Sequence, residues 1–408
     1  MITACLIGKK LGHSYSPVIH AYFGYEYKNV ELEENQIEDF LLHGEFDCFN
    51  VTVPYKKAVM PFLTLSPEAS ELGAVNTIVR KDGILTGYNT DYYGFSRLIE
   101  DNGVNVAEKK VVILGTGGAS SVVQAYMKKK GANLVVVGRK ETNNYDNLYL
   151  HYDADIIVNA TPVGMYPNNL ESPIDLKPFS NCSFVADLIY NPFKTALLLQ
   201  ADELGIKSAN GLSMLVWQAI KASEYFCGKD NSNLFEKIYS DLCFKEKNII
   251  LVGMPSSGKS RIGKALAKKL EREFFDLDKE IEKREQKDIP TIFAEQGERY
   301  FRKIESDILG ELSKLSGKVI ATGGGSVMGE NAKYKIKQNS FVVYLKRKKI
   351  STHGRPLLAS NGISAYKKLQ IERDPVYTSL ADVIVQNDGP VEKTINSIIG
   401  ELYENYCY

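Results

Sequence analysis

The sequence predicts an α/β protein with parallel sheets. Apolar runs of strand length alternate with helical stretches along all 408 residues, and this alternation favours parallel sheets covered by helices over sandwiches or helix bundles. Two of the apolar runs, 111–114 and 249–252, lead into glycine-rich turns that are followed by helical stretches. A chain of this length is expected to form two or three domains.

The first 245 residues are expected to form two of these domains. Residues 1–95 form an α/β substrate domain that opens with a strand at 2–7 and is closed by the segment 84–91. Residues 96–245 form a Rossmann domain with a dinucleotide-binding turn. Its expected elements are strands at 111–114, 134–137, 155–161 and 184–188 and a helix that ends at Lys130.

The polar segment 228–247 is the expected linker region, and the alternative for part of it is a last helix at 234–244. We place the boundary near residue 245, so that residues 246–408 form a third α/β domain. Its most informative motif is Gly-Met-Pro-Ser-Ser-Gly-Lys-Ser at 253–260. This motif is a complete phosphate loop that lies between an expected strand at 249–252 and an expected helix at 261–270. We therefore expect residues 246–408 to fold as a P-loop nucleoside-monophosphate-kinase-like domain.

The loop predicts a site for a nucleoside triphosphate. Gly253 and Gly258 let the backbone wrap a phosphate, and Lys259 reaches the β- and γ-phosphate oxygens. The hydroxyl of Ser260 is a candidate ligand for Mg²⁺. The alternative is a glycine-containing turn that binds nothing, but every fixed position of the motif is filled and both flanks have the required pattern.

Composition excludes several classes of protein. The net charge is zero, but residues 1–243 carry 21 Lys and Arg against 28 Asp and Glu, and the remainder carries 29 against 22. A basic second half suits a phosphorylated ligand, and no basic stripe with interleaved aromatic residues indicates nucleic acid.

The six cysteines lie far apart, so we expect reduced thiols and no zinc site. No signal peptide or membrane-spanning apolar run is recognisable, and we expect a soluble, cytoplasmic protein with no membrane partner.

Seven short segments of the first half are informative as an ordered set. They are Gly12-His13-Ser14-Tyr15-Ser16-Pro17, Asn50-Val51-Thr52-Val53-Pro54-Tyr55-Lys56, Gly73-Ala74-Val75-Asn76-Thr77, Gly87-Tyr88-Asn89-Thr90-Asp91, 159–165, 187–192 and 210–218. In this order they resemble shikimate dehydrogenase over essentially all of residues 1 to about 227. The resemblance implies reduction of 3-dehydroshikimate to shikimate with NADPH as the hydride donor.

The residues of these segments suit that chemistry. Reduction of a ring ketone needs a proton donor at the developing alkoxide, and Lys56 with Asp91 is a suitable catalytic pair because the carboxylate orients the ammonium. In the family, matching neutral residues hold the substrate's hydroxyls and carboxylate. The candidate substrate-binding residues are Ser14, Ser16, Thr52, Asn76, Asn89, Tyr190 and Gln218. Taken singly, each is more often a cap or turn residue, Ser14 and Asn89 in particular.

The candidate NADPH site begins at the turn Gly115, Gly117, Gly118, Ala119 and Ser120. The turn alone is a weak signal, because Ser120 stands where the fingerprint has its third glycine. Arg139 is expected to face the 2′-phosphate, since an NAD-specific site would place a carboxylate there, and the alternative is a solvated cation at a strand end. The resemblance adds Thr161, Met165 and Gly211 to the cofactor site. Only 141–153 remain where the family usually has a full helix and strand.

Five further segments follow the phosphate loop as an ordered set. They are Phe274-Phe275-Asp276-Leu277-Asp278, 293–302, Ala321-Thr322-Gly323-Gly324-Gly325, Gly354-Arg355-Pro356-Leu357-Leu358 and 372–377. Together with the loop they resemble shikimate kinase over nearly all of residues 248–400. The resemblance implies ATP-dependent phosphorylation of shikimate, with Mg²⁺ at the triphosphate.

The same resemblance implies the roles of single residues. Arg302 and Arg373 grip the substrate carboxylate, and Asp278 accepts from its hydroxyls and orients or deprotonates the attacking one. Asp276 supports Mg²⁺ together with the loop serine. Gly323, Gly324 and Gly325 permit close backbone approach beneath the ring. Arg355 is the lid arginine that closes on the phosphoryl group. The segment before it, 346–354, is shorter than the family's lid, so adenine recognition is the least secure part of this interpretation.

The sequence therefore predicts a bifunctional enzyme of the shikimate pathway that acts on two small molecules, 3-dehydroshikimate and shikimate. One alternative is a non-catalytic sensor of shikimate or quinate, which would be expected to have lost groups such as Lys56 and Asp278. A second is a dehydrogenase for quinate or shikimate that uses NAD and carries a weakened kinase domain, which Arg139 disfavours. The sequence does not indicate an oligomeric state.

Overall fold

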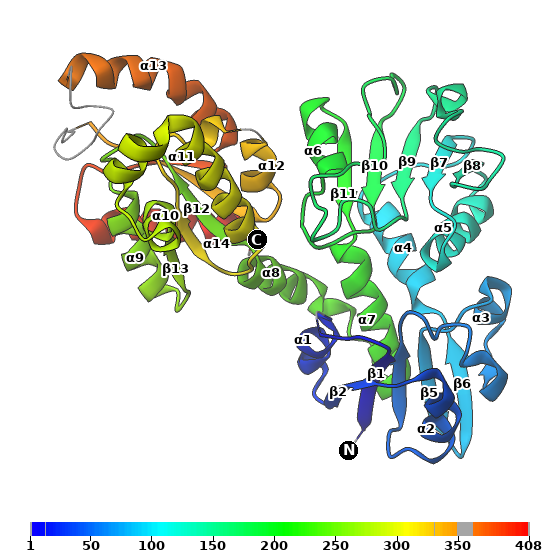
Figure 1. The fold of residues 1–408 in the computed structure, drawn as a ribbon. Helices are drawn as coiled ribbons and strands as arrows, with labels where there is room; N and C mark the ends of the chain where they lie inside the picture. Colours follow the sequence, from blue (N-terminus) through cyan, green and yellow to red (C-terminus); the bar gives the residue numbers. More distant parts are fainter. Residues whose placement is uncertain (1, 13, 330, 349–361, 407–408) are drawn as a thin grey trace. The chain divides into compact units, whose positions relative to one another are not determined.

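The computed structural model describes residues 2–12, 14–329, 331–348 and 362–406 (Figure 1). The predicted α/β class is confirmed: two of the three sheets are entirely parallel, the third is mixed, and helices flank them. The chain divides into two compact units. The first comprises Met1–Pro162, Pro173–Tyr190 and Gln200–Tyr239, and the second comprises Val163–Ser172, Asn191–Leu199 and Ser240–Tyr408.

The first sheet of the first unit has the strand order β2-β1-β3-β5-β6-β4. β1 pairs in parallel with β2 and β3, whereas β5 pairs antiparallel with β3 and β6. Fully buried Ile7, Phe49 and Ile78 belong to its core. The strands are β1 Thr3–Gly8, β2 Glu26–Glu31, β3 Cys48–Val51, β4 Thr64–Leu65, β5 Thr77–Lys81 and β6 Ile84–Tyr88, and the helices are α1 Ser16–His20, α2 Ile37–His43 and α3 Pro67–Leu72.

The second sheet has the parallel order β11-β10-β9-β7-β8. Its central strands are apolar and buried on both faces, as expected for a sheet covered by helices. The strands are β7 Lys110–Leu114, β8 Asn133–Val137, β9 Ile156–Asn159, β10 Phe184–Asp187 and β11 Lys207–Asn210. The helices are α4 Thr90–Asp101, α5 Gly118–Lys129, α6 Ala196–Glu203, α7 Leu212–Cys227 and α8 Phe235–Glu246. α4 and α7 pack along each other and connect the two sheets (Figure 1).

The third sheet belongs to the second unit and has the parallel order β13-β14-β12-β15-β16. The carboxyl end of the central strand β12 therefore opens into the phosphate loop with strands on either side. The strands are β12 Asn248–Val252, β13 Phe274–Asp276, β14 Val319–Ala321, β15 Ser340–Lys346 and β16 Val383–Gln386. The helices are α9 Lys259–Lys269, α10 Leu277–Glu285, α11 Ile289–Ser313, α12 Ala332–Lys337, α13 Gly362–Leu380 and α14 Val391–Tyr406.

The second unit also contains a buried pair of amides. The Nδ2 of Asn169 donates to Oε1 of Gln338, and Nε2 of Gln338 donates to the Asn169 carbonyl at 2.5 Å. The Gln338 carbonyl in turn accepts from the Lys194 N–H at 2.8 Å. Since Asn169 and Gln338 are 3% and 1% exposed, these reciprocal bonds tie 163–172 and 191–199 into the unit.

No helix among the described residues is both long enough and apolar enough to cross a membrane.

Candidate active sites

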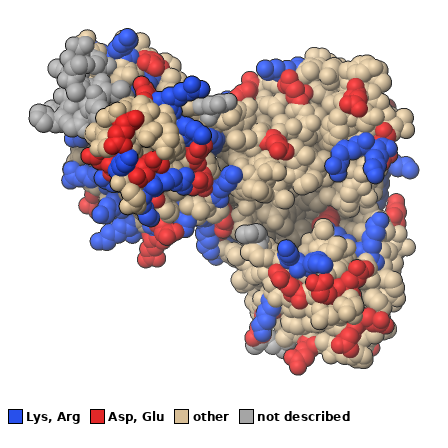
Figure 2. All heavy atoms as spheres, viewed as in Figure 1, with Lys and Arg blue, Asp and Glu red and all other residues tan. Residues whose placement is uncertain are grey.

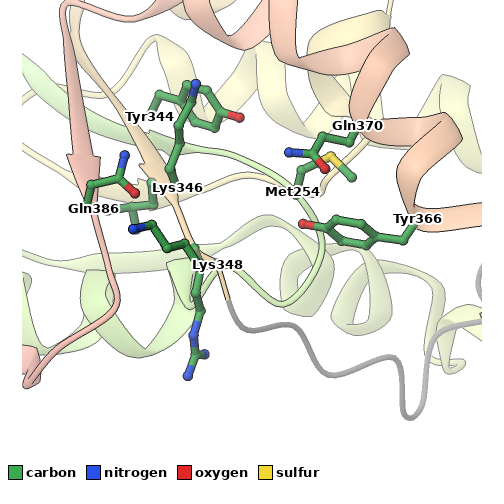
Figure 3. A pocket seen from close by; sticks show the side chains of 9 residues that line it. Met254, Tyr344, Lys346, Lys348, Tyr366, Gln370 and Gln386 are labelled. Atoms are coloured by element: carbon green, nitrogen blue, oxygen red, sulfur yellow. The ribbon is translucent and has the colours of Figure 1, made fainter. Parts of the chain in front are cut away.

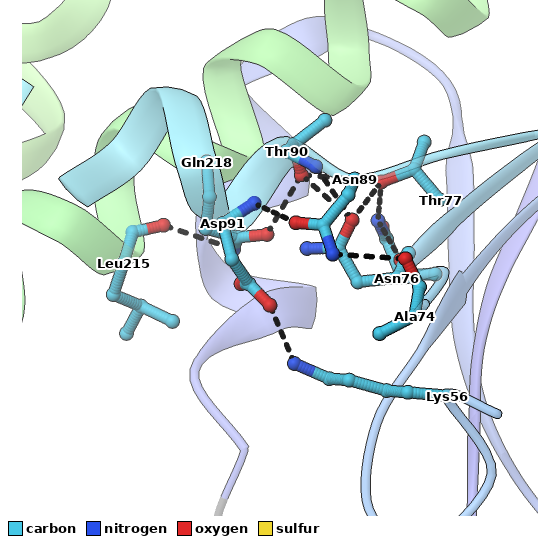
Figure 4. A network of polar contacts seen from close by, with 10 residues as sticks. Lys56, Ala74, Asn76, Thr77, Asn89, Thr90, Asp91, Leu215 and Gln218 are labelled. Atoms are coloured by element: carbon cyan, nitrogen blue, oxygen red, sulfur yellow. Dashed lines mark hydrogen bonds and ion pairs between the residues drawn. The ribbon is translucent and has the colours of Figure 1, made fainter. Parts of the chain in front are cut away.

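Lys56 and Asp91 form an ion pair in the first unit. The Nζ of Lys56 lies 2.6 Å from Oδ2 of Asp91, and the two side chains are 28% and 16% exposed. Asp91 lies in the first turn of α4, where Asn89 is the N-cap: Asn89 Oδ1 accepts from the Asp91 N–H at 3.1 Å, and its Nδ2 donates to the Ala74 carbonyl at 2.9 Å (Figure 4). The structure thus brings the predicted pair together, and the cap holds the backbone of Asp91.

Asn76 has a defined side-chain orientation. Its Oδ1 accepts from the backbone N–H of Thr90 at 2.7 Å and from the hydroxyls of Thr90 and Thr77 at 3.2 and 3.1 Å (Figure 4). Because a backbone N–H can only donate, the atom that faces Thr90 must be the amide oxygen. The Nδ2 of Asn76 is therefore directed away from Thr90 as a donor.

Gln218 reaches the same network from α7. Its Oε1 accepts from the Thr90 hydroxyl at 3.4 Å, and its Nε2 donates to the Leu215 carbonyl at 3.0 Å (Figure 4). Three predicted residues that are far apart in the sequence, Asn76, Asp91 and Gln218, are thus joined through Thr90 and the start of α4.

The remaining predicted residues of this group lie on other segments of the unit. Ser16 is the first residue of α1 and is buried, and its N–H donates to Oγ of Ser14 at 3.2 Å. Thr52, half-buried, follows β3 directly, and its N–H donates to the Ile7 carbonyl at 3.0 Å. The ring of Tyr190 packs against the ring of Tyr15, with the ring centroids 5.4 Å apart. Burial raises the pKa of Tyr190. Figure 2 shows the surface hollowed between the lobe of the first sheet and the lobe of the second.

The glycine-rich turn follows β7 and leads into α5. Gly115 has a φ of +105°, and a Cβ there would lie 3.0 Å from the Ala160 carbonyl oxygen, so only glycine suits this turn. Gly117 is the N-cap of α5, and open space surrounds the Cβ positions of Gly117 and Gly118. Ala119 is exposed, whereas Ser120 is fully buried and accepts from Gln124 Nε2 at 3.0 Å. The open turn at the N-terminus of α5 leaves room for a pyrophosphate, which the first N–H groups of the helix can bind.

Arg139 is an exposed residue two positions beyond the end of β8. Burial raises the pKa of Tyr145, and the positive charge of Arg139 acts against this rise. The Glu141 side chain lies next to the turn, because a Cβ on Gly138 would contact both Glu141 Cγ and Thr116 Cγ2 at 2.7 Å. A cation, Arg139, and a carboxylate, Glu141, thus both lie just beyond the end of β8.

The other candidate cofactor residues differ in their surroundings. The N–H and hydroxyl of Thr161 donate to Oδ1 of Asn159 at 3.0 and 2.7 Å. Gly211 packs against the backbone, where a Cβ would lie 2.1 Å from the Leu188 carbonyl oxygen. Met165, which belongs to the second unit, is 46% exposed.

The phosphate loop connects β12 to α9 as predicted. Gly258 is the N-cap of α9 with a φ of +96°, and Gly253 has a φ of +146°. Lys259 is 7% exposed, and its Nζ donates to the carbonyls of Gly253 and Met254 at 2.8 and 3.0 Å. Ser260 is exposed in the first turn of α9. The loop therefore has the backbone curvature and the cation that a triphosphate requires.

The three glycines 323–325 lie among the side chains predicted to hold the substrate. A Cβ on Gly323 would be 3.0 Å from Asp278 Oδ1, and one on Gly325 would be 2.4 Å from NH1 of Arg302. Arg373 NH1 donates to the Gly324 carbonyl at 2.9 Å. Arg302, Arg373 and Asp278 therefore converge on one short segment, where a side chain at Gly323 or Gly325 would displace the ends of neighbouring polar side chains.

The two arginines are held differently. Arg302 donates to Glu305 at 2.7 Å and to Glu298 at 3.2 Å. Burial acts to lower the pKa of Arg302, but these carboxylates outweigh it and raise the pKa. Arg373 is 6% exposed, and among the described residues its Nε is a buried donor with no hydrogen-bond partner. Such an unsatisfied donor is rare in a native structure and fits a carboxylate ligand.

The structure describes the residues predicted to support Mg²⁺ but not the predicted lid arginine. Asp276 is the N-cap of α10, and its Oδ1 accepts from the Asp278 N–H at 3.2 Å. Nowhere in the described ranges do three or more His, Cys, Asp or Glu side chains gather as a metal site would need. Serine and aspartate oxygens still suit Mg²⁺, which usually keeps several waters and takes few protein ligands. Arg355 lies outside the described residues.

A pocket of about 190 Å³ lies beside the phosphate loop (Figure 3). Lys346 and Gln386, from the ends of β15 and β16, face Tyr366 and Gln370 of α13 across it, next to Met254. It is lined by amide, phenol and ammonium groups, which can donate to phosphate or base oxygens.

Some residues of these sites were not predicted. Glu305, 3% exposed, links Arg302 to the Ser326 hydroxyl, which donates to it at 2.6 Å. Glu305 is three residues from Arg302 on α11, and this spacing in the sequence indicates an ion pair on one face of a helix. Thr77 and Thr90 lie inside the recognised segments but were not singled out. Asn387, which contacts the phosphate loop, had no signal in the sequence.

Comparisons with known proteins cover both parts of the chain. Residues 6–78 match the family model of the shikimate dehydrogenase substrate binding domain, and residues 255–403 match that of shikimate kinase. Shikimate dehydrogenase (NADP(+)) of Caldicellulosiruptor bescii is 38% identical over 248 residues, which cover 53% of this chain and 86% of that protein.

Two solved structures are similar to the first part. Shikimate dehydrogenase 1 from Peptoclostridium difficile is 40% identical with a TM-score of 0.54 and covers 59% of this chain and 98% of its own. A chorismate mutase/shikimate 5-dehydrogenase fusion protein from Clostridium acetobutylicum is 35% identical with a TM-score of 0.57 and covers 59% of this chain and 97% of its own.

Proposed function

The chain belongs to the shikimate dehydrogenase family and carries a shikimate kinase domain, and from this premise we propose that it catalyses two consecutive steps. The first is reduction of 3-dehydroshikimate to shikimate with NADPH, and the second is phosphorylation of the 3-hydroxyl of shikimate with ATP. Residues 1–95, 96–245 and 246–408 are the proposed substrate, dinucleotide and kinase domains.

The observation that carries the reduction is the ion pair of Lys56 and Asp91 at 2.6 Å. NADPH supplies the hydride when it is bound. The Lys56 ammonium donates a proton to the alkoxide oxygen that develops from the ring ketone, and Asp91 holds the ammonium in place. The pair is partly buried, so it is screened by solvent less than a surface pair.

The substrate is held by neutral groups around this pair. Asn76 uses its oxygen within the protein, so its Nδ2 is the group that donates to a substrate hydroxyl. We assign the substrate's carboxylate to the hydroxyls of Ser14 and Ser16 at the start of α1. Further proposed contacts come from Thr52, Asn89, Tyr190 and Gln218.

The dinucleotide is proposed to lie on the turn between β7 and α5. Gly115, Gly117 and Gly118 with Ala119 and Ser120 form its cradle, where the first N–H groups of α5 face the pyrophosphate. Arg139, exposed beyond β8, pairs with the 2′-phosphate that distinguishes NADPH from NADH. Thr161 and Gly211 complete the proposed site within the first unit, and Met165 stays a prediction from the sequence.

For the phosphorylation, the supporting observation is the convergence of Arg302, Arg373 and Asp278 on 323–325. The buried Nε of Arg373 and the Arg302 guanidinium bind the shikimate carboxylate. Asp278 orients or deprotonates the attacking 3-hydroxyl.

The triphosphate is proposed to bind the loop 253–260. Lys259 exchanges its two carbonyl partners for β- and γ-phosphate oxygens. Ser260 and, through water, Asp276 support Mg²⁺, which neutralises charge on the transferring group. Arg355 is the proposed lid arginine.

One coupled assay tests both steps. The purified full-length chain with 3-dehydroshikimate should consume NADPH, and ADP should appear only when ATP and Mg²⁺ are added. A protein that binds shikimate without consuming NADPH or ATP would be the sensor considered above. Equal rates with quinate and NAD would instead identify a dehydrogenase of the alternative type.

A further inference from the structure

Asn387, the residue directly after β16, contacts the phosphate loop from a distant part of the chain. Its Nδ2 donates to the Ser257 carbonyl at 2.7 Å. A Cβ on Gly258 would lie 2.4 Å from the same nitrogen. The side chain of Asn387 is 8% exposed. It therefore packs against two consecutive residues of the loop.

The orientation of the Asn387 amide is determined by its neighbours. The hydroxyl of Thr394, in the first turn of α14, donates to Oδ1 at 3.0 Å. The Asn387 N–H donates to the Lys346 carbonyl at 2.7 Å, which ties the residue to β15. Because the Ser257 carbonyl can only accept, the amide must present its NH₂ group to the loop.

This bond sets the direction of one peptide group. In a trans peptide the C=O of one residue and the N–H of the next point in opposite directions. Holding the Ser257 carbonyl toward Asn387 therefore turns the Gly258 N–H to the opposite side of the loop. Successive N–H groups directed to that side form the concave site that binds a phosphate.

We propose that Asn387 is a positioning residue for the triphosphate: it fixes the Ser257–Gly258 peptide so that its N–H faces the phosphates. This inference rests on the proposed kinase function. It deepens that function, because the residue acts through the loop and on the phosphates alone. The nucleotide base has no part in it.

The test is binding to full-length protein of three ligands: inorganic tripolyphosphate, ATP and GTP, each with Mg²⁺. Asn387→Ala should weaken all three by about the same factor, roughly tenfold for the loss of one hydrogen bond to a buried carbonyl. Weakened ATP binding with unchanged tripolyphosphate binding would overturn the proposal, because it would place Asn387 at the base.

A matched pair at Thr394 tests the orientation of the amide. Thr394→Val removes the hydroxyl and keeps the shape, and it should weaken tripolyphosphate binding by about threefold, whereas Thr394→Ser should bind as the wild type does. Thermal unfolding followed by circular dichroism shows whether each variant is folded, including the second unit, to which residues 387 and 394 belong. If the wild type binds no tripolyphosphate or ATP, the proposed kinase function fails. If it binds them and both Asn387→Ala and Thr394→Val bind equally well, only the role of Asn387 fails.

Discussion

Replacing Lys56 with methionine should remove the proton donor of the reduction and leave most of the site in place. The Lys56 Nζ is 2.6 Å from Asp91 Oδ2. Methionine is unbranched like lysine and fills a similar volume, but it has no ammonium group to donate a proton. General acid catalysis contributes about 10²–10⁴-fold. The turnover number should therefore fall by about that factor, which corresponds to about 2.7–5.4 kcal/mol in the barrier.

The KM for 3-dehydroshikimate should change by less than about threefold in this variant, because Asn76 and the other neutral partners remain. The assay follows NADPH consumption at saturating substrate and at several lower concentrations. Lys57→Met is the matched control, since Lys57 is the exposed neighbour and should have a normal rate. A normal turnover number for Lys56→Met, or an equal loss in the control, would refute the assignment of the acid.

Three further predictions concern the cofactor, the buried amides and the nucleotide. Arg139→Asp should reverse or abolish the preference for NADPH over NADH, because a carboxylate would repel the 2′-phosphate, and equal use of both cofactors by the wild type would contradict the role of Arg139. Asn169→Ala should lower the free energy of unfolding by about 1–3 kcal/mol in denaturant titrations, because Gln338 stays buried without its partner. The exposed neighbour gives the control, Asn168→Ala, which should change it by less than about 0.5 kcal/mol. GTP should compete with ATP better than in a kinase with a longer lid, because the loop 253–260 contacts only the triphosphate, and adenine-selective binding in titrations of both nucleotides would argue against this.

Local patterns were sufficient to predict the elements beside the glycine-rich turns. The strand expected at 249–252 is β12, and the helix expected at 261–270 is α9, which begins two residues earlier because left-handed Gly258 is its N-cap. The alternative helix at 234–244 is present as α8. The segment 141–153 contains only a short 3₁₀ helix at Leu148–His151, as its reduced length indicated.

Contacts between distant residues were beyond sequence reasoning. Asn387 and Ser257 are 130 positions apart, and Asn169 and Gln338 are 169 apart. Nothing in the composition of either neighbourhood distinguishes these amides from those of exposed turns. Asn76 was predicted as a site residue, but which end of its amide faces a ligand follows only from the Thr90 N–H.

The groups proposed to act on the ketone are all attached to the first sheet. Asn76 precedes β5, Asp91 follows β6, and the Lys56 carbonyl accepts from the Val75 N–H at 2.8 Å. The glycine-rich turn belongs to the second sheet, and α4 and α7 connect the two. A rotation of one sheet against the other would change access for the dinucleotide and leave the Lys56–Asp91 pair intact. The proton donor and the carboxylate that orients it are therefore already in place before either ligand binds.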